Sequence, residues 1–314
     1  MTPSCSPRAC SLFDRSDGLT FAYKVLNRPL LSSGKTPLVL VTGLSAVGLI
    51  DWFPLADLIA EKRPVLMFDN RGIGSSKIPE EKKNDPYTVG DMAQDVIELV
   101  KHLGWSKIDI LGFSMGGMIV QKLLTNDGKP LPFKIEHAVL TATSAKRAHS
   151  DLLKAIPKGG GEGKEMTRED KRKLVEPFTY VNYSPDFVKD PKNRKLLNQR
   201  IDESIDSRRP ARTVQQQVGV IAGYDVRKQL SSIPSTLPVL VLHGTLDRSV
   251  YYTEAKYILE GIKHAKLQTF EGVGHMWYDY YTPRYWSNLL DKFLEDPKGG
   301  DVTSLNPPNS KARL

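Results

Sequence analysis

Short apolar runs of strand length alternate with helical patterns along most of this chain. Pro37–Thr42 and Pro64–Asp69 are almost continuously apolar, which is typical of strands buried on both faces. Thr88 can cap a helix whose first turn contains Asp91, and Gly104 can end that helix. This alternation predicts an α/β fold with a mostly parallel central sheet flanked by helices.

The remaining elements follow the same pattern. Leu19–Leu26 alternates apolar and polar residues, so we expect an early edge strand there. The other expected strands are Ile108–Leu111, Ala138–Ala142, Pro238–Leu242 and Leu267–Phe270. The other expected helices are Met115–Leu124, Lys195–Ile205, Ala255–Ile262 and Tyr285–Leu294.

Residues 143–237 interrupt this alternation with a glycine-rich stretch, Lys158–Lys164, followed by a highly charged run. We interpret them as a helical cap inserted into a core formed by residues 19–142 and 238–294. Residues 1–18 are expected to form a flexible leader, and the polar residues 295–314 a disordered tail.

Composition excludes several classes of protein. Hydrophobic residues make up 40% of the 314 residues, enough for a large core. The two cysteines, Cys5 and Cys10, both lie in the leader, so neither a disulfide framework nor a zinc site is expected. No secretory signal is recognisable, and the longest apolar runs fall far short of the ~20 residues that a membrane span needs. We expect no cofactor and no metal.

The formal net charge of +8 is concentrated in one part of the chain. Lys146–Arg212 contains 17 Lys or Arg residues against 11 Asp or Glu residues. This segment is either a solvated charged surface or a cap that attracts anionic substrates. No groove-reading motif accompanies the charge, which disfavours nucleic-acid binding.

The strongest chemical signal is Gly112-Phe113-Ser114-Met115-Gly116-Gly117. It follows an expected strand and opens an expected helix, the context of a nucleophile elbow. Such a turn holds the serine in strained geometry, and small residues two positions before and after it relieve crowding. The Met115 N–H, at the positive end of the helix, would face a developing oxyanion.

A serine hydroxyl needs an adjacent base, and His275 is the best candidate of the six histidines. It lies in a glycine-flanked loop, Gly272–Met276, just after the last expected strand. Asp247 follows strand Pro238–Leu242 and would orient the histidine. The chain order Ser, Asp, His is the order found in α/β-hydrolases.

With these motifs the chain resembles the α/β-hydrolase superfamily over residues 19–294, in a pattern similar to its lactonase, esterase and C–C hydrolase-like branch. Thr42-Gly43-Leu44 and Trp52 match the family's H-G-x…W stretch, with Thr42 in place of the usual histidine. The resemblance implies that the Leu44 N–H is the second oxyanion donor. It also implies that Asp69–Ser76, a D-x-R-G-x-G-x-S loop, is mainly structural.

The reaction expected from these residues is two-step acyl transfer through an acyl-enzyme. The partner would be a small-molecule acyl substrate: a carboxylic ester, lactone or thioester. Two alternatives stay open. The same triad could serve C–C bond hydrolysis or a cofactor-free perhydrolase reaction, or the chain could be a non-catalytic member of the fold that binds a small molecule.

The tripeptide Ala312-Arg313-Leu314 resembles a peroxisomal address of the S-K-L type. We therefore expect a peroxisomal import receptor as a partner and a peroxisomal location, and otherwise a cytoplasmic one. In that case the chain would resemble fungal peroxisomal hydrolases, and acyl-CoA esters would suit the basic cap. A fluorescent fusion carrying the last ten or so residues tests the address, and diffuse signal would count against it.

Overall fold

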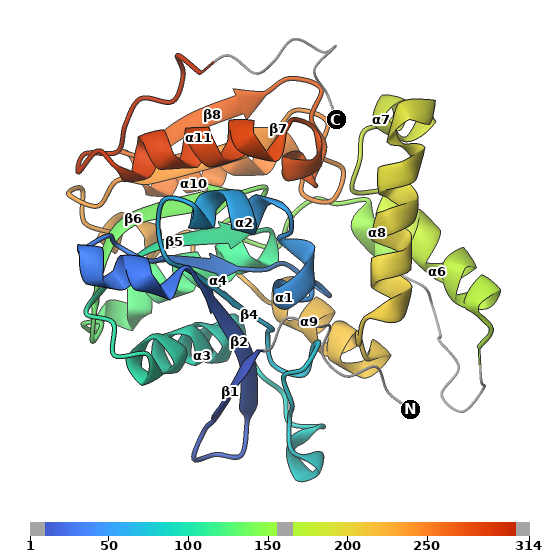
Figure 1. Cartoon of the computed structure of the whole chain (residues 1–314), viewed down its shortest axis with the longest axis horizontal. Helices are drawn as coiled ribbons and strands as arrows, with labels where there is room; N and C mark the ends of the chain where they lie inside the picture. The colour runs from blue at the N-terminus through green and yellow to red at the C-terminus, as the bar shows by residue number, and fades with distance from the viewer. Residues whose placement is uncertain (1–9, 156–165, 306–314) are drawn as a thin grey trace.

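The computed structural model describes residues 10–155 and 166–305. It contains an eight-stranded sheet in the order β1-β2-β4-β3-β5-β6-β7-β8 (Figure 1). β1 and β2 pair antiparallel with their neighbours, whereas β3 to β8 run parallel. The strands are β1 (Ser11–Asp14), β2 (Thr20–Leu26), β3 (Leu38–Val41), β4 (Val65–Phe68), β5 (Lys107–Phe113), β6 (Lys134–Thr141), β7 (Val239–Gly244) and β8 (Lys266–Phe270). The predicted α/β architecture is confirmed.

Helices cover both faces of the sheet, and each face has its own hydrophobic cluster. Alternate residues of a strand point to opposite faces, so Val39 of β3 packs in one cluster and Leu40 in the other. The first cluster takes in α3 (Val89–His102), α4 (Met115–Thr125) and α10 (Ala255–Gly261). The second takes in α2 (Leu55–Ala60) and α11 (Pro283–Leu294). Burial on both faces explains why the central strands are apolar throughout.

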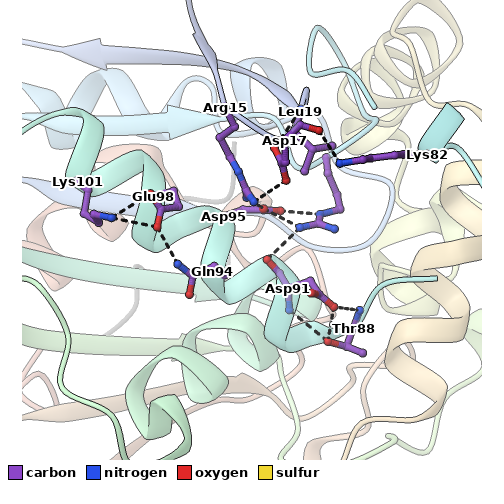
Figure 2. Close-up of polar contacts among 11 residues, drawn as sticks. Arg15, Asp17, Leu19, Lys82, Thr88, Asp91, Gln94, Asp95, Glu98 and Lys101 are labelled. Carbon is purple, nitrogen blue, oxygen red and sulfur yellow. Dashed lines mark hydrogen bonds and ion pairs between the residues drawn. The ribbon is translucent and has the colours of Figure 1, made fainter. Parts of the chain in front are cut away.

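Helix α3 begins at the predicted cap. The Thr88 hydroxyl accepts a hydrogen bond from the Asp91 N–H at 3.2 Å, and the Asp91 carboxylate accepts one from the Thr88 N–H at 2.7 Å (Figure 2). One turn further on, Asp95 is buried and forms an ion pair with Arg15 at 2.5 Å. The pair therefore fixes the turn between β1 and β2 to α3.

Two segments differ from expectation. Ser11–Asp14 falls in the expected leader but forms β1, so β1 is the edge strand rather than β2. Only Phe13 of this strand is partly buried, where it stacks on His102, so the side chains of β1 carry little signal and main-chain pairing with β2 defines it. In the expected tail, Val302 is only 3% exposed and packs in the second cluster. The tripeptide Ala312-Arg313-Leu314 lies outside the described residues, and the peroxisomal address stays a prediction.

The chain between β6 and β7 carries the segment that we call the cap, residues 143–237. Its helices are α5 (Leu152–Ala155), α6 (Arg168–Tyr180), α7 (Pro185–Lys189), α8 (Arg194–Asp206) and α9 (Ala211–Ala222). In Figure 1, α6, α7 and α8 stand together at one side of the sheet, while α9 lies near α1 (Gly48–Asp51). Within the described ranges no helix has the length and apolar character that a membrane crossing requires.

Candidate active site

Ser114 lies in a sharp turn between the end of β5 and the start of α4. Its backbone has φ 56° and ψ −122°, a conformation that is costly for a residue with a side chain. Neighbouring groups hold it there: the Ser114 N–H donates to the Thr141 carbonyl at 2.9 Å, and the Thr143 hydroxyl donates to the Ser114 carbonyl at 2.7 Å. The predicted strand–turn–helix context of the elbow is therefore confirmed.

The glycines around Ser114 are required by close packing. A Cβ atom placed on Gly112 would lie 2.5 Å from the Gly116 carbonyl oxygen. One placed on Gly116 would lie 2.1 Å from the carbonyl oxygen of Val41, in β3. Neither distance leaves room for a methyl group, so the small residues let α4 start directly against the sheet.

Asp247 and His275 meet beyond the ends of β7 and β8. His275 Nδ1 lies 2.8 Å from Asp247 Oδ2, and both side chains are buried. Because Nδ1 faces a carboxylate, it carries the proton, and Nε2 keeps its lone pair in the neutral ring. The pair therefore presents a histidine nitrogen that can accept a proton.

Asp247 is surrounded by donors. Its Oδ1 accepts hydrogen bonds from the N–H groups of Ser249 and Val250, both at 2.8 Å. His243 Nε2 lies 3.3 Å from Oδ2 and 2.9 Å from the Val250 carbonyl oxygen. Burial raises the pKa of Asp247, but the charge of His275 and the hydrogen bonds from His243 and His275 outweigh it and lower the pKa to about 2.

His275 also packs against the elbow. The ring of Phe113, which directly precedes Ser114, lies 4.8 Å from the imidazole ring, measured between centroids. Among the described residues the Ser114 hydroxyl has no hydrogen-bond partner. In catalytic sites the bond between nucleophile and base often becomes short only when substrate binds. The structure thus brings Asp247 and His275 into direct contact and Phe113 of the elbow against the imidazole ring.

The two expected oxyanion donors both border Ser114. Met115 is the first residue of α4, so its N–H has no acceptor within the helix. The Leu44 N–H, in the loop after β3, donates to no described residue. A Cβ atom on Gly43 would lie 3.0 Å from Ser114 Cβ, which places the peptide before Leu44 against the nucleophile.

The two other motifs have structural contacts. Thr42 is buried, and its hydroxyl accepts a hydrogen bond from the Asn70 amide at 3.2 Å. Asp69 accepts hydrogen bonds from the N–H groups of Leu49 at 3.1 Å and Ser75 at 2.8 Å. Burial raises the pKa of Asp69 to about 6, against the effect of these two bonds. The Asp69 carboxylate therefore ties two loops together and is separate from the Asp247–His275 pair.

Sequence reasoning missed several residues that support the site. His243 directly follows the predicted strand Pro238–Leu242 and precedes the Asp247 loop, and this position at the same sheet edge was the available signal. Arg200 of α8 forms an ion pair at 2.7 Å with Asp279, which lies four residues after His275. Gln217 of α9 accepts a hydrogen bond from Ser45 N–H. Spacing along the chain carries no sign of these last two contacts, because they depend on how the cap docks.

Trp277 lies two residues after His275. Its ring lies 4.7 Å from that of Trp286 in α11 and is buried in the second cluster, so it packs in the core. Tyr278 and Trp52 pack in the same cluster. In residues 10–155 and 166–305, no group of three or more His, Cys, Asp or Glu side chains is arranged to hold a metal ion.

Comparison with known proteins agrees with this fold. A family model described as alpha/beta hydrolase fold matches residues 36–280. A proline iminopeptidase of Lactobacillus crispatus is 27% identical over an alignment of 298 positions that covers 87% of this chain and 94% of that protein. The 3-oxoadipate enol-lactonase 2 of Acinetobacter baylyi is 24% identical, and the match covers 83% of this chain and 90% of that protein. The solved structure of an esterase from Rhodococcus sp. ECU1013 shares the fold, with a TM-score of 0.72 at 22% identity. The match covers 91% of this chain and 98% of that one.

Proposed function

Because the chain belongs to the α/β-hydrolase fold family, whose model matches residues 36–280, we propose that it is a serine hydrolase. Ser114 is the nucleophile, His275 the general base, and Asp247 the carboxylate that orients His275. The observation that carries the proposal is the strained Ser114 at the end of β5, together with the 2.8 Å contact between His275 and Asp247.

The proposed reaction has two halves. His275 Nε2 takes the Ser114 proton as the hydroxyl oxygen attacks the substrate carbonyl carbon, and the N–H groups of Leu44 and Met115 stabilise the oxyanion. Collapse of the tetrahedral intermediate breaks the bond to the leaving group, which takes the proton from His275. Water then attacks the acyl-enzyme with His275 as base, and the carboxylic acid leaves.

The proposed substrates are small carboxylic esters, lactones or thioesters. The names of the relatives support this class, because an enol-lactonase and an esterase are among them. A second candidate is cleavage of an amide bond after an N-terminal proline, which is favoured by the match to proline iminopeptidases. Acyl transfer through Ser114 is common to both candidates.

A fluorophosphonate probe tests the nucleophile. We expect the probe to label the wild type and the Ser287→Ala variant but not the Ser114→Ala variant, since Ser287 is a buried serine of α11 that donates to the Leu58 carbonyl. Labelling of Ser114→Ala at the wild-type rate would refute the proposal.

Turnover separates the substrate classes. The panel contains p-nitrophenyl butyrate, a δ-lactone, an acyl-CoA and proline p-nitroanilide. Turnover of the preferred compound should fall by at least about 10³-fold in Ser114→Ala, because the remaining donors and binding contacts retain only part of the rate. If proline p-nitroanilide alone is cleaved, the ester and lactone assignment is wrong and the second candidate holds.

A further inference from the structure

Ser45 has an unusual backbone in the loop that supplies the Leu44 N–H. Its φ is 63°, in the left-handed region that residues other than glycine rarely adopt. The residue is 6% exposed, so it is held inside the molecule. A conformation of this kind persists only where surrounding contacts determine it.

Both backbone polar groups of Ser45 are bound by side chains of the cap. The Ser45 N–H donates to Gln217 Oε1 at 2.8 Å, and the Ser45 carbonyl accepts from Arg209 Nη1 at 2.6 Å. Arg209 is anchored in turn by two bonds to the Asp51 carboxylate, at 2.9 and 3.1 Å. Asp51 also accepts a hydrogen bond from the Val47 N–H at 2.9 Å. Side chains of the cap thus bind this loop at the two peptide groups that flank Ser45, and Asp51 of the core links Arg209 to the Val47 N–H.

The surroundings of Gln217 indicate a specific role rather than packing. Its side chain is fully buried, and its Nε2 has no hydrogen-bond partner among the described residues. An unpaired buried amide nitrogen is unfavourable, and an apolar side chain of similar size would avoid that cost. The bond from the Ser45 N–H is what distinguishes glutamine from such a side chain at this position.

We propose that Gln217 and Arg209 are positioning residues for catalysis, which hold Leu44 and Ser45 so that the Leu44 N–H faces the oxyanion formed at Ser114. This inference rests on the proposed function. The two cap side chains act through the loop and do not touch the reacting atoms. Loss of an aligned oxyanion donor lowers kcat by about 10²–10³-fold, and partial misalignment costs less.

Two adjacent pairs of residues give matched controls. Gln216 bonds the Lys83 carbonyl at 3.0 Å, away from the site, and Arg208 bonds the carbonyls of Gly72 at 3.1 Å and Gly74 at 3.3 Å. Gln216 and Arg208 have the same side chains as Gln217 and Arg209, and they also bind the cap to the core. Neither forms a hydrogen bond with Ser45. Gln216→Met and Arg208→Met therefore report the cost of loosening the cap alone.

The experiment measures kcat and KM of Gln217→Met and Arg209→Met against these controls, on the substrate that the wild type turns over best. We expect kcat to fall by about 10- to 100-fold with KM changed less than about threefold, since the lost stabilisation belongs to the transition state. Affinity for an alkylboronic acid, whose adduct with the serine is tetrahedral, should weaken by a similar factor. The control variants should keep wild-type kcat and boronate affinity.

The outcomes are separable. If Gln217→Met and Arg209→Met match their controls in kcat and in boronate affinity, the inference is overturned. Should Gln217→Met fail to fold, the Arg209→Met and Arg208→Met pair decides alone, because Arg209 is partly exposed. If the wild type shows no turnover that depends on Ser114, the proposed function itself has failed, and this is known before any cap variant is made.

Discussion

Asp247 is 4% exposed, and both oxygens of its carboxylate face donors. With a pKa of about 2 it is ionised throughout the neutral range, so it can stabilise an imidazolium at His275 whenever one forms. Its low pKa also contributes to stability. That contribution is complete above about pH 4, the ordinary pKa of aspartate, and is lost as the pH falls towards 2.

Asp247→Asn should lower kcat by about 10⁴-fold, because an amide facing Nδ1 can favour the tautomer in which Nε2 is protonated. The unfolding free energy of the variant should be lower than that of the wild type at pH 7, and the difference should shrink below about pH 4. Steady-state kinetics and urea titrations at pH 7 and pH 3 measure both effects. Asp225→Asn, at an exposed ion pair with Arg227, is the control. A kcat within tenfold of wild type would contradict the assigned role.

The places of Ser114, Asp247 and His275, which we propose as a triad, could be predicted because each residue stands in a short motif just after a strand, and the carboxyl ends of parallel strands meet at one edge. Gln217 could not be predicted in this way. It lies 172 residues from Ser45 in the chain, and its contact exists only after the cap has docked on the core.

At the scale of elements, α8 is fixed to the loop that carries His275. Arg200 and Asp279 are 7% and 4% exposed, and Asp279 also accepts a hydrogen bond from the Tyr183 hydroxyl at 2.7 Å. Both partners are removed from water, so the loss of one leaves an uncompensated buried charge. The pair therefore makes the position of the His275 loop depend on the docking of the cap.

Arg200→Met should lower the free energy of unfolding by about 3–5 kcal/mol, because the Asp279 carboxylate stays buried without its cation. Adding Asp279→Leu should restore part of that loss. Arg194→Met, at an exposed position of the same helix, should change stability by less than about 0.5 kcal/mol. Urea unfolding measures all three, and equal stabilities of Arg200→Met and Arg194→Met would show that the pair contributes nothing.

The central strands of the sheet could be predicted because burial on two faces makes them apolar throughout. β1 could not be predicted, because it lacks such burial. Three of its four residues are exposed and only Phe13 is partly buried, so the strand is defined mainly by main-chain bonds to β2.

In the whole molecule, the cap and the core share both hydrophobic clusters. Tyr183, Phe187 and Leu197 of the cap pack in the cluster that contains α2 and α11. Val220 and Tyr224 pack in the cluster that contains α3 and α4. The basic character of the cap is also partly neutralised within the fold, since Arg209 pairs with Asp51 of the core. A segment with these contacts is a structural part of the hydrolase domain.

The cap and the core should therefore unfold in one cooperative transition. Far-ultraviolet circular dichroism, which reports the helices of both parts, and near-ultraviolet circular dichroism of the aromatic clusters should give the same midpoint in urea. An early transition that removes helical signal while the aromatic signal persists would mean that the cap opens independently.

The hydrogen bonds from the cap to the Ser45 backbone have a consequence for protein engineering. Exchanging the region between β6 and β7 with that of a relative is a natural route to new selectivity. Here the donor segment would also have to bring a guanidinium for the Ser45 carbonyl and an amide oxygen for its N–H. A chimera without them would bind its new ligand and turn it over slowly, so poor catalysis by a graft would not by itself mean that the wrong ligand was chosen.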